Sequence, residues 1–139
     1  MPAAKASVRR LDTVARSLPQ VDKGISWGDR PSYLVAGRPF ILWRGPRKDA
    51  VDEQGERIPD VIMFSVPTAE DKEAVLAGGP PWFTTDHFTG YNAVLIREAH
   101  LPQLSAAELT EMVQDAWLAK APKRVAKEWL AGRDNPPDR

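Results

Sequence analysis

Apolar residues recur at helical spacing in three long stretches of the chain, and each stretch has a recognisable boundary. Residues 6–18 predict an amphipathic helix that the following proline stops, because a residue before proline is pushed out of the helical region. Residues 65–77 predict a second helix, which ends at a run of two glycines and two prolines. Ser105 and Glu108 predict the capping box of a third helix, whose apolar stripe ends at Trp117.

Shorter apolar runs between these stretches are typical of β-strands. They lie at residues 33–35, 40–43, 61–64, 82–85 and 93–96. Gly37, Arg38 and Pro39 indicate a tight hairpin between the first two runs, and residues 19–32 read as turns because they are rich in glycine and proline. Since short turns join most strands, the sequence predicts an α+β fold with a mainly antiparallel sheet and helices packed on one face.

The domain organisation follows from length and from the breaker residues near the end of the chain. A chain of 139 residues is typical of one domain, which we place at residues 1–131. A last short helix is predicted over 122–130, and the tail 132–139 is expected to be flexible because it contains mainly turn and breaker residues. Residues 45–57 are polar and carry charges of both signs, which predicts a long exposed loop.

The net charge is zero, but it is unevenly distributed. Nineteen Lys and Arg balance nineteen Asp and Glu over the whole chain. Residues 1–50 hold ten basic against four acidic residues, a net of +6, and residues 51–100 hold three against nine, a net of −6. The balance excludes a broadly cationic coat for nucleic acid, whereas the asymmetry leaves room for a one-faced basic surface.

The chain contains no cysteine, which excludes disulfides, thiolate metal sites and a cysteine nucleophile. No apolar run approaches the ~18 residues that a transmembrane helix needs, so we expect no membrane association. The basic N-terminus lacks the apolar segment of a secretory signal, and we therefore expect a cytoplasmic protein.

An ordered series of short motifs resembles the MmcQ/YjbR family of small bacterial proteins over roughly residues 7–130. The series comprises Leu18-Pro19, Trp27-Gly28, Tyr33-Leu34-Val35, Gly37, Phe40, Phe83-Thr84-Thr85, His87, Gly90-Tyr91, Ala93-Val94-Leu95-Ile96-Arg97, Asp115-Ala116-Trp117 and Ala121-Pro122-Lys123-Arg124. The resemblance implies a CyaY/frataxin-like sheet with flanking helices. It also implies DNA binding, which is the usual label of the family, and no catalytic residues are defined for its members. The charged segment 45–57 departs from the family pattern as an insertion between strands that should be adjacent.

The clearest candidate for nucleic-acid contact is a basic strip near the end of the chain. It consists of Lys120, Lys123, Arg124 and Lys127, which would share one side of a helix. Leu118, Val125 and Trp129 would occupy the opposite, apolar side. The same pattern is also that of an ordinary amphipathic helix with a solvated face. Arg9, Arg10 and Arg16 of the first helix would extend the strip if the two helices were neighbours.

An alternative is a binding domain for a small ligand or protein partner, with a cleft near Trp27, Trp82, His87 and Tyr91. Trp27 and Trp82 stand in loop-like surroundings, whereas the other three tryptophans lie on strands or helix stripes. His87 beside a carboxylate is compatible with proton transfer or metal binding, but a turn held by hydrogen bonds between His87 and Tyr91 is the commoner structure.

Catalysis has the least support in the sequence. There is no nucleophile–base motif, no phosphate-binding glycine loop, and only two histidines to act as metal ligands. The four carboxylates of the 45–57 loop lack the spacing of a calcium loop. We therefore expect a non-enzymatic binding protein without a metal or cofactor, whose partner is DNA bound weakly and in a salt-sensitive manner, or else a ligand of the aromatic cleft.

Overall fold

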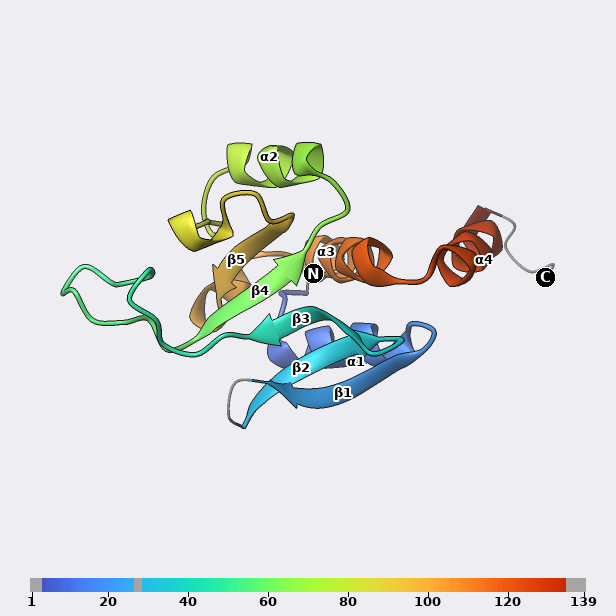
Figure 1. The fold of residues 1–139 in the computed structure, drawn as a ribbon, viewed down its shortest axis with the longest axis horizontal. Helices are drawn as coiled ribbons and strands as arrows, with labels where there is room; N and C mark the ends of the chain where they lie inside the picture. Colours follow the sequence, from blue (N-terminus) through green and yellow to red (C-terminus); the bar gives the residue numbers. More distant parts are fainter. Residues whose placement is uncertain (1–3, 27–28, 135–139) are drawn as a thin grey trace.

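The computed structural model describes residues 4–26 and 29–134, and within them five strands form one antiparallel sheet with the order β1-β2-β3-β4-β5 (Figure 1). The elements in chain order are α1 (Val8–Ser17), β1 (Val21–Ser26), β2 (Arg30–Val35), β3 (Arg38–Trp43), β4 (Val61–Ser65), α2 (Ala69–Ala77), η1 (Asp86–Phe88), β5 (Ala93–Arg97), η2 (Glu98–Gln103), α3 (Ala106–Lys120) and α4 (Lys123–Asp134). The α+β class predicted from the sequence is confirmed.

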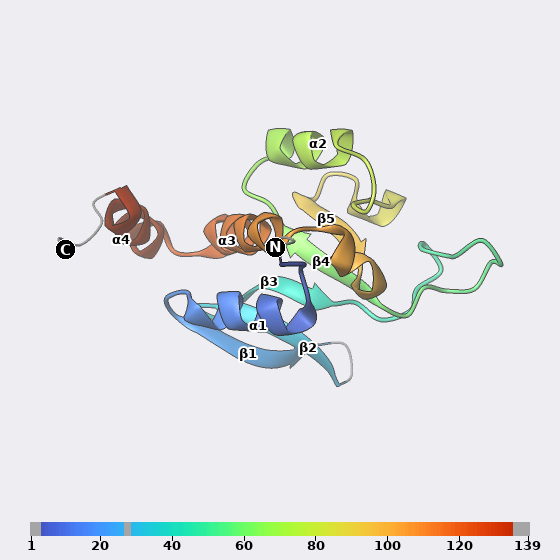
Figure 2. The ribbon, with the colours of Figure 1, turned by 180° about the vertical axis from the view of Figure 1, so that it is seen from behind.

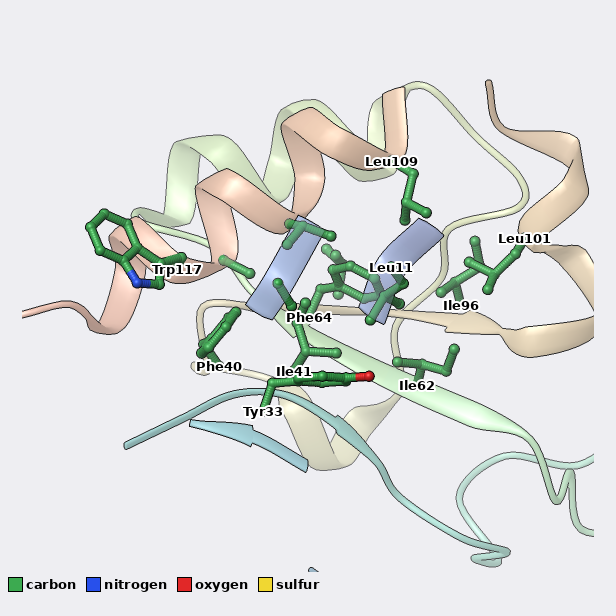
Figure 3. Close-up of a cluster of buried hydrophobic side chains, with 14 of the residues drawn as sticks. Leu11, Tyr33, Phe40, Ile41, Ile62, Phe64, Ile96, Leu101, Leu109 and Trp117 are labelled. Atoms are coloured by element: carbon green, nitrogen blue, oxygen red, sulfur yellow. The ribbon is translucent and has the colours of Figure 1, made fainter. Parts of the chain in front are cut away.

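The main core lies between one face of the sheet and the helices α1 and α3, which run side by side across it (Figures 1 and 2). The largest side chains in this layer are fully buried: Trp117, Tyr33, Phe40, Phe64, Leu11 and Ile41 (Figure 3). Burying one such side chain stabilises the fold by about 1.5–3 kcal/mol. The helix α2 adds Val75 and Leu76 to the rim of the same core.

A second, smaller core covers the other face of the sheet at its β4–β5 end. Successive side chains of a strand point to opposite faces of the sheet. The side chains of Val61 and Leu95 therefore point away from the main core and belong to this second cluster. No long helix covers them. Ala50 and Ile58 from the segment between β3 and β4, and Phe88 from η1, pack there instead.

The predicted helix boundaries are largely confirmed by their capping hydrogen bonds. Ser7 accepts from the backbone of Arg10 at the start of α1, and Ser105 and Glu108 form the full reciprocal capping box of α3. The helix α2 begins at Ala69, four residues later than Ser65, because Thr68 is its N-cap and Ser65 still pairs with β5.

Three β features differ from the sequence predictions. The turn-rich stretch includes the edge strand β1, which pairs along its whole length with β2. The β2–β3 hairpin turns at Ala36 and Gly37, with φ of 49° and 81°, so the following arginine and proline already belong to β3. Residues 82–85 form no strand, and Phe83 alone bridges to Leu95.

The segment 45–57 connects the adjacent strands β3 and β4 and is largely exposed, as its polarity predicts, but it also contains local structure. Val51 and Arg57 form an antiparallel bridge, and the Asp52 side chain accepts hydrogen bonds from the backbone of Gln54 and Glu56 at the tip. Ala50 is buried in the second core. Burial of one small residue and the Asp52 turn thus fix the segment.

Candidate anion-binding surfaces

The predicted basic strip is divided by a break between two helices. The helix α3 ends at Lys120, and Ala121 adopts an extended conformation with ψ of 144° before α4 begins at Lys123. Lys120 therefore belongs to α3 and does not continue the face of α4, which corrects the single helical side predicted for the four cations. Lys120 instead lines a pocket with Tyr91 beside the β4 and β5 strands.

The position of α4 is set by two tryptophans. The ring of Trp129 packs against that of the fully buried Trp117, with the centroids 5.2 Å apart. Val125 and Ala126 of α4 also pack against the main core. The apolar side of α4 thus faces the body of the protein, as its sequence pattern predicts, and the rest of the helix projects beyond the sheet (Figures 1 and 2).

The three cations of the predicted strip that lie on α4 are in solvent. Lys123, Arg124 and Lys127 are exposed, and Arg124 donates to Glu128 at 3.3 Å. Both partners of this ion pair are more than two thirds exposed, so the pair contributes little to stability and leaves the guanidinium accessible. Arg133 lies over the Trp129 ring at 4.8 Å and adds a further cation to α4.

The C-terminal end of α1 reaches the same end of the molecule. The Trp117 indole donates to the carbonyl of Pro19, just after α1, at 3.0 Å. Arg16 stands in the last turn of α1, exposed and 3.7 Å from Asp12. Arg9 and Arg10 lie in the first turn of α1, at its other end. Of the three α1 arginines considered as an extension of the basic strip, Arg16 is therefore the one nearest the end of the molecule that carries α4.

The aromatic cleft predicted from the sequence is not assembled around one pocket. Trp82 packs edge-on against Phe64, with centroids 5.2 Å apart, and lines the two pockets beside residues 78–81. His87 and Tyr91 stack on each other at 6.2 Å but line different pockets. Trp27 lies outside the described residues. Trp82 lines neither the pocket of His87 nor the pocket of Tyr91.

The turn that carries His87 and Tyr91 is held from a neighbouring helix. The Lys72 ammonium of α2 donates to the carbonyls of Phe88 and Tyr91 at 2.7 and 2.8 Å. These bonds, with the ring stacking of His87 and Tyr91, fix the turn. Within the turn, the backbone N–H of Tyr91 donates to the carbonyl of Phe88, in keeping with the predicted hydrogen-bonded turn, and the rings of His87 and Tyr91 stack on each other.

A different, strongly basic pocket lies at the root of the 45–57 segment. This segment is far from α4 (Figure 1). Its volume is about 560 Å³, and its lining comprises Arg30, Arg44, Gly45, Pro46, Arg47, Lys48, Asp49, Arg57 and His87. One carboxylate thus stands among five basic side chains and a histidine. Charge convergence of this kind is suited to an anion.

Arg44 is the buried member of this pocket. Its side chain is only 3% exposed, its Nη1 donates to Asp49 Oδ2 at 2.7 Å, and its guanidinium lies 5.5 Å from the centre of the Phe88 ring. Its Nε and Nη2 have no hydrogen-bond partner among the described residues. An unpaired buried donor costs stability, so this edge of the guanidinium favours a ligand that can accept hydrogen bonds.

Asp49 holds Arg44 in place and stays ionised. Thr85 donates to the same Oδ2 atom of Asp49 at 2.7 Å. Burial raises the pKa of Asp49, but the hydrogen bonds from Arg44 and Thr85 and the charge of Arg44 outweigh it, and the net pKa lies below its usual value. The ionised carboxylate orients the guanidinium.

Gly45 allows Arg30 to lie across the pocket wall. Its φ is +79°, and a Cβ atom there would lie 2.8 Å from Arg30 Nε. Arg30 in turn donates to the carbonyl of Pro59 at 3.3 Å. The backbone conformation thus favours glycine, and a Cβ atom would in addition displace the Arg30 side chain.

Sequence reasoning did not identify this pocket, because its members come from β2, from the end of β3, from the 45–57 segment and from η1. The net of +6 in residues 1–50 was the signal available. Of the loop carboxylates considered for cation binding, Asp49 pairs with Arg44 and Asp52 caps a turn. In the part of the chain that the structure describes, no group of three or more potential ligands could hold a metal ion.

The described helices include none that is both long and apolar enough to cross a bilayer. The fold and its surfaces define a small α+β protein with basic surfaces at two ends and a buried arginine in one of them. The sequence model of the YjbR family matches residues 16–119, and the chain therefore belongs to the YjbR family. This confirms the resemblance drawn from its motifs.

The curated relatives are mycobacterial. The chain is 34% identical over 108 residues to uncharacterized proteins of Mycobacterium bovis and of two strains of Mycobacterium tuberculosis. Each alignment covers 73% of this chain and 81% of the relative. No solved structure shows a significant match.

Proposed function

We propose that this protein is a non-enzymatic, cytoplasmic binding protein that contacts the phosphate backbone of DNA through α4. The observation that carries the proposal is the orientation of that helix. Trp129 fixes its apolar side on Trp117, and this leaves Lys123, Arg124 and Lys127 exposed beyond the edge of the sheet. The DNA-binding label of the YjbR family adds weight to the same assignment.

The charges present on α4 define a weak and sequence-independent contact. Three exposed cations can neutralise about three phosphates, and release of their counterions drives the association. The other exposed residues of α4 include Glu128, Leu130 and Arg133, and Arg133 lies over the Trp129 ring. Phosphate contacts position a protein on DNA and carry no sequence information themselves. The binding is therefore expected to discriminate little among sequences.

Charge reversal on α4 tests this function directly. The variant with Lys123→Glu, Arg124→Glu and Lys127→Glu should lose binding of a fluorescent DNA duplex at low salt, measured by anisotropy. Its matched control carries Lys5→Glu, Arg9→Glu and Arg10→Glu, which change the net charge equally at exposed sites near the start of α1.

The control separates local contact from overall charge. Retention of binding by the control and its loss in the α4 variant would support the proposal. Equal loss in both variants, or no binding of the unmodified protein at low salt, would contradict it. Circular dichroism of each variant shows whether the helices are intact.

A further inference from the structure

We infer that the basic pocket at the root of the 45–57 segment binds a phosphate dianion, either free or as the phosphate group of a small monoester. The inference is independent of the DNA-binding proposal, because the pocket is lined by residues of the 45–57 segment and its neighbours. That segment and α4 lie at opposite ends of the molecule (Figures 1 and 2). It rests on the donor edge of Arg44, on the surplus of positive charge around it, and on the rigidity of the pocket.

The donor edge of Arg44 has the geometry that an oxyanion requires. In a guanidinium, the Nε–H and one N–H of Nη2 point in parallel along one edge and form a fork for two oxygens. Both of these nitrogens lack a partner, whereas Nη1 on the other side is engaged by Asp49. Both nitrogens are buried as well as unpaired, so an oxyanion reaches this edge once the exposed side chains that line the pocket reorient.

The charge of the pocket favours a dianion over a singly charged anion. Asp49 offsets Arg44, and the cations of Arg30, Lys48 and Arg57 remain around the same cavity. Lys48 and Arg57 are exposed, so their side chains can reorient onto a ligand. A phosphate dianion offers them further acceptor oxygens beyond the two held by the Arg44 fork.

The rigid part of the site lowers the cost of binding. Arg44 is packed on Phe88, and Asp49 is held by both Arg44 and Thr85. Phe88 lies in the second core, so the guanidinium rests on a fixed surface. A group that is already ordered before binding loses little conformational entropy on binding. The cavity of about 560 Å³ exceeds a phosphate ion and has room for the organic part of a monoester.

Isothermal titration calorimetry with four probes tests the site and identifies the source of the phosphate. The probes are inorganic phosphate, glycerol 3-phosphate, adenosine 5′-monophosphate and adenosine, all at constant ionic strength. Saturable binding of at least one phosphate compound, with no binding of adenosine, is the expected result. Tighter binding of the monoesters than of inorganic phosphate assigns the ligand as a monoester, and the reverse order assigns it as the free ion.

Two variants connect binding to the pocket. Arg44→Lys keeps the charge opposite Asp49 but removes the fork, and it should weaken phosphate binding by about tenfold or more. The double variant Lys48→Ala and Arg57→Ala changes only exposed side chains and should weaken binding similarly. If urea unfolding shows that Arg44→Lys does not fold, the double variant alone tests whether phosphate binds in this pocket.

The control removes two cations elsewhere. Arg9→Ala with Arg10→Ala loses the same charge from α1 and should bind the phosphate probes as the unmodified protein does. Reversing the three α4 cations should also leave this binding intact, which separates the pocket from the DNA contact. Absence of binding by all phosphate probes at millimolar concentration would overturn the inference. Undiminished binding in the pocket variants would overturn it as well.

Discussion

The ring of Trp129 rests against the ring of Trp117 with centroids 5.2 Å apart and an interplanar angle of 59°. Trp117 is fully buried under the sheet, and its indole N–H also donates to the carbonyl of Pro19. One side chain of α3 therefore contacts both the end of α1 and α4. The surface that we assign to DNA depends on this ring contact together with the packing of Val125 and Ala126 on the main core.

The two tryptophans should differ strongly in their effect on stability. Trp117→Ala removes a fully buried ring and is expected to lower the free energy of unfolding by about 3–5 kcal/mol. Trp129 is only partly buried, so Trp129→Ala should cost clearly less and mainly loosen α4. Urea unfolding measures the first effect, and hydrogen exchange of the α4 amides measures the second. A larger loss of stability for Trp129→Ala would contradict this packing scheme.

Three carboxylates should make the protein sensitive to acid. Hydrogen bonding from Tyr33 and the nearby cations, chiefly Lys23, lower the pKa of Asp12 despite some burial. For Asp49 and Asp60, burial raises the pKa, but hydrogen bonds and a paired arginine outweigh it and the net pKa is lowered. At these three sites the unfolded chain therefore binds more protons than the folded chain around pH 4, and their contribution to the free energy of unfolding is lost as pH falls through the lowered pKa values of the folded state.

Asp60 offers the clearest test of this acid sensitivity. It accepts from Arg97 and from the backbone of Ala99, both at 2.9 Å. In Asp60→Asn, the free energy of unfolding should be lower at pH 7 and should decline less between pH 6 and pH 3, because one of the responsible carboxylates is gone. Urea unfolding series across this range measure the slope. An unchanged slope in the variant would show that Asp60 does not contribute.

Gly45 and Gly55 form a matched pair in the 45–57 segment. Their φ values are +79° and +80°, so an alanine at either position should cost roughly 1 kcal/mol from backbone strain. A Cβ at Gly45 would also lie 2.8 Å from Arg30, whereas a Cβ at Gly55 would meet nothing within 4 Å. Urea unfolding should therefore give a larger loss for Gly45→Ala. Equal losses would show that Arg30 moves aside without cost.

Helices and their ends follow closely from the sequence, because local signals determine them. Ser105 and Glu108 form the capping box that their spacing predicts, and the stripe ending at Trp117 is buried. The edge strand β1 was not predicted, because no local signal in the sequence marks it as a strand. Its residues are largely exposed and include Gly24, which accommodates Leu34 at close range, so pairing with β2 and not burial maintains it.

The basic surfaces show the same division between local and long-range information. The exposure of Lys123 and Lys127 follows from the pattern of one helix. Lys120 is separated from the other three cations by the helix break at Ala121, which the sequence pattern did not show. The pocket around Arg44 forms only because four segments of the chain come together in the fold. The cations of α4 are close together in the sequence, so the sequence alone could indicate them. The charged residues of the pocket lie on separate segments of the chain and come together only in the fold.

The salt dependence of DNA binding tests the central claim most directly. The association constant of the unmodified protein and of a Lys123→Ala, Arg124→Ala and Lys127→Ala variant is measured by anisotropy from 25 to 200 mM salt, roughly the range over which counterion release dominates. Loss of three phosphate contacts should make the slope of log K against log salt less negative by roughly 2–3 in the variant. Identical slopes for the two proteins would contradict the assignment of α4 as the DNA-binding surface.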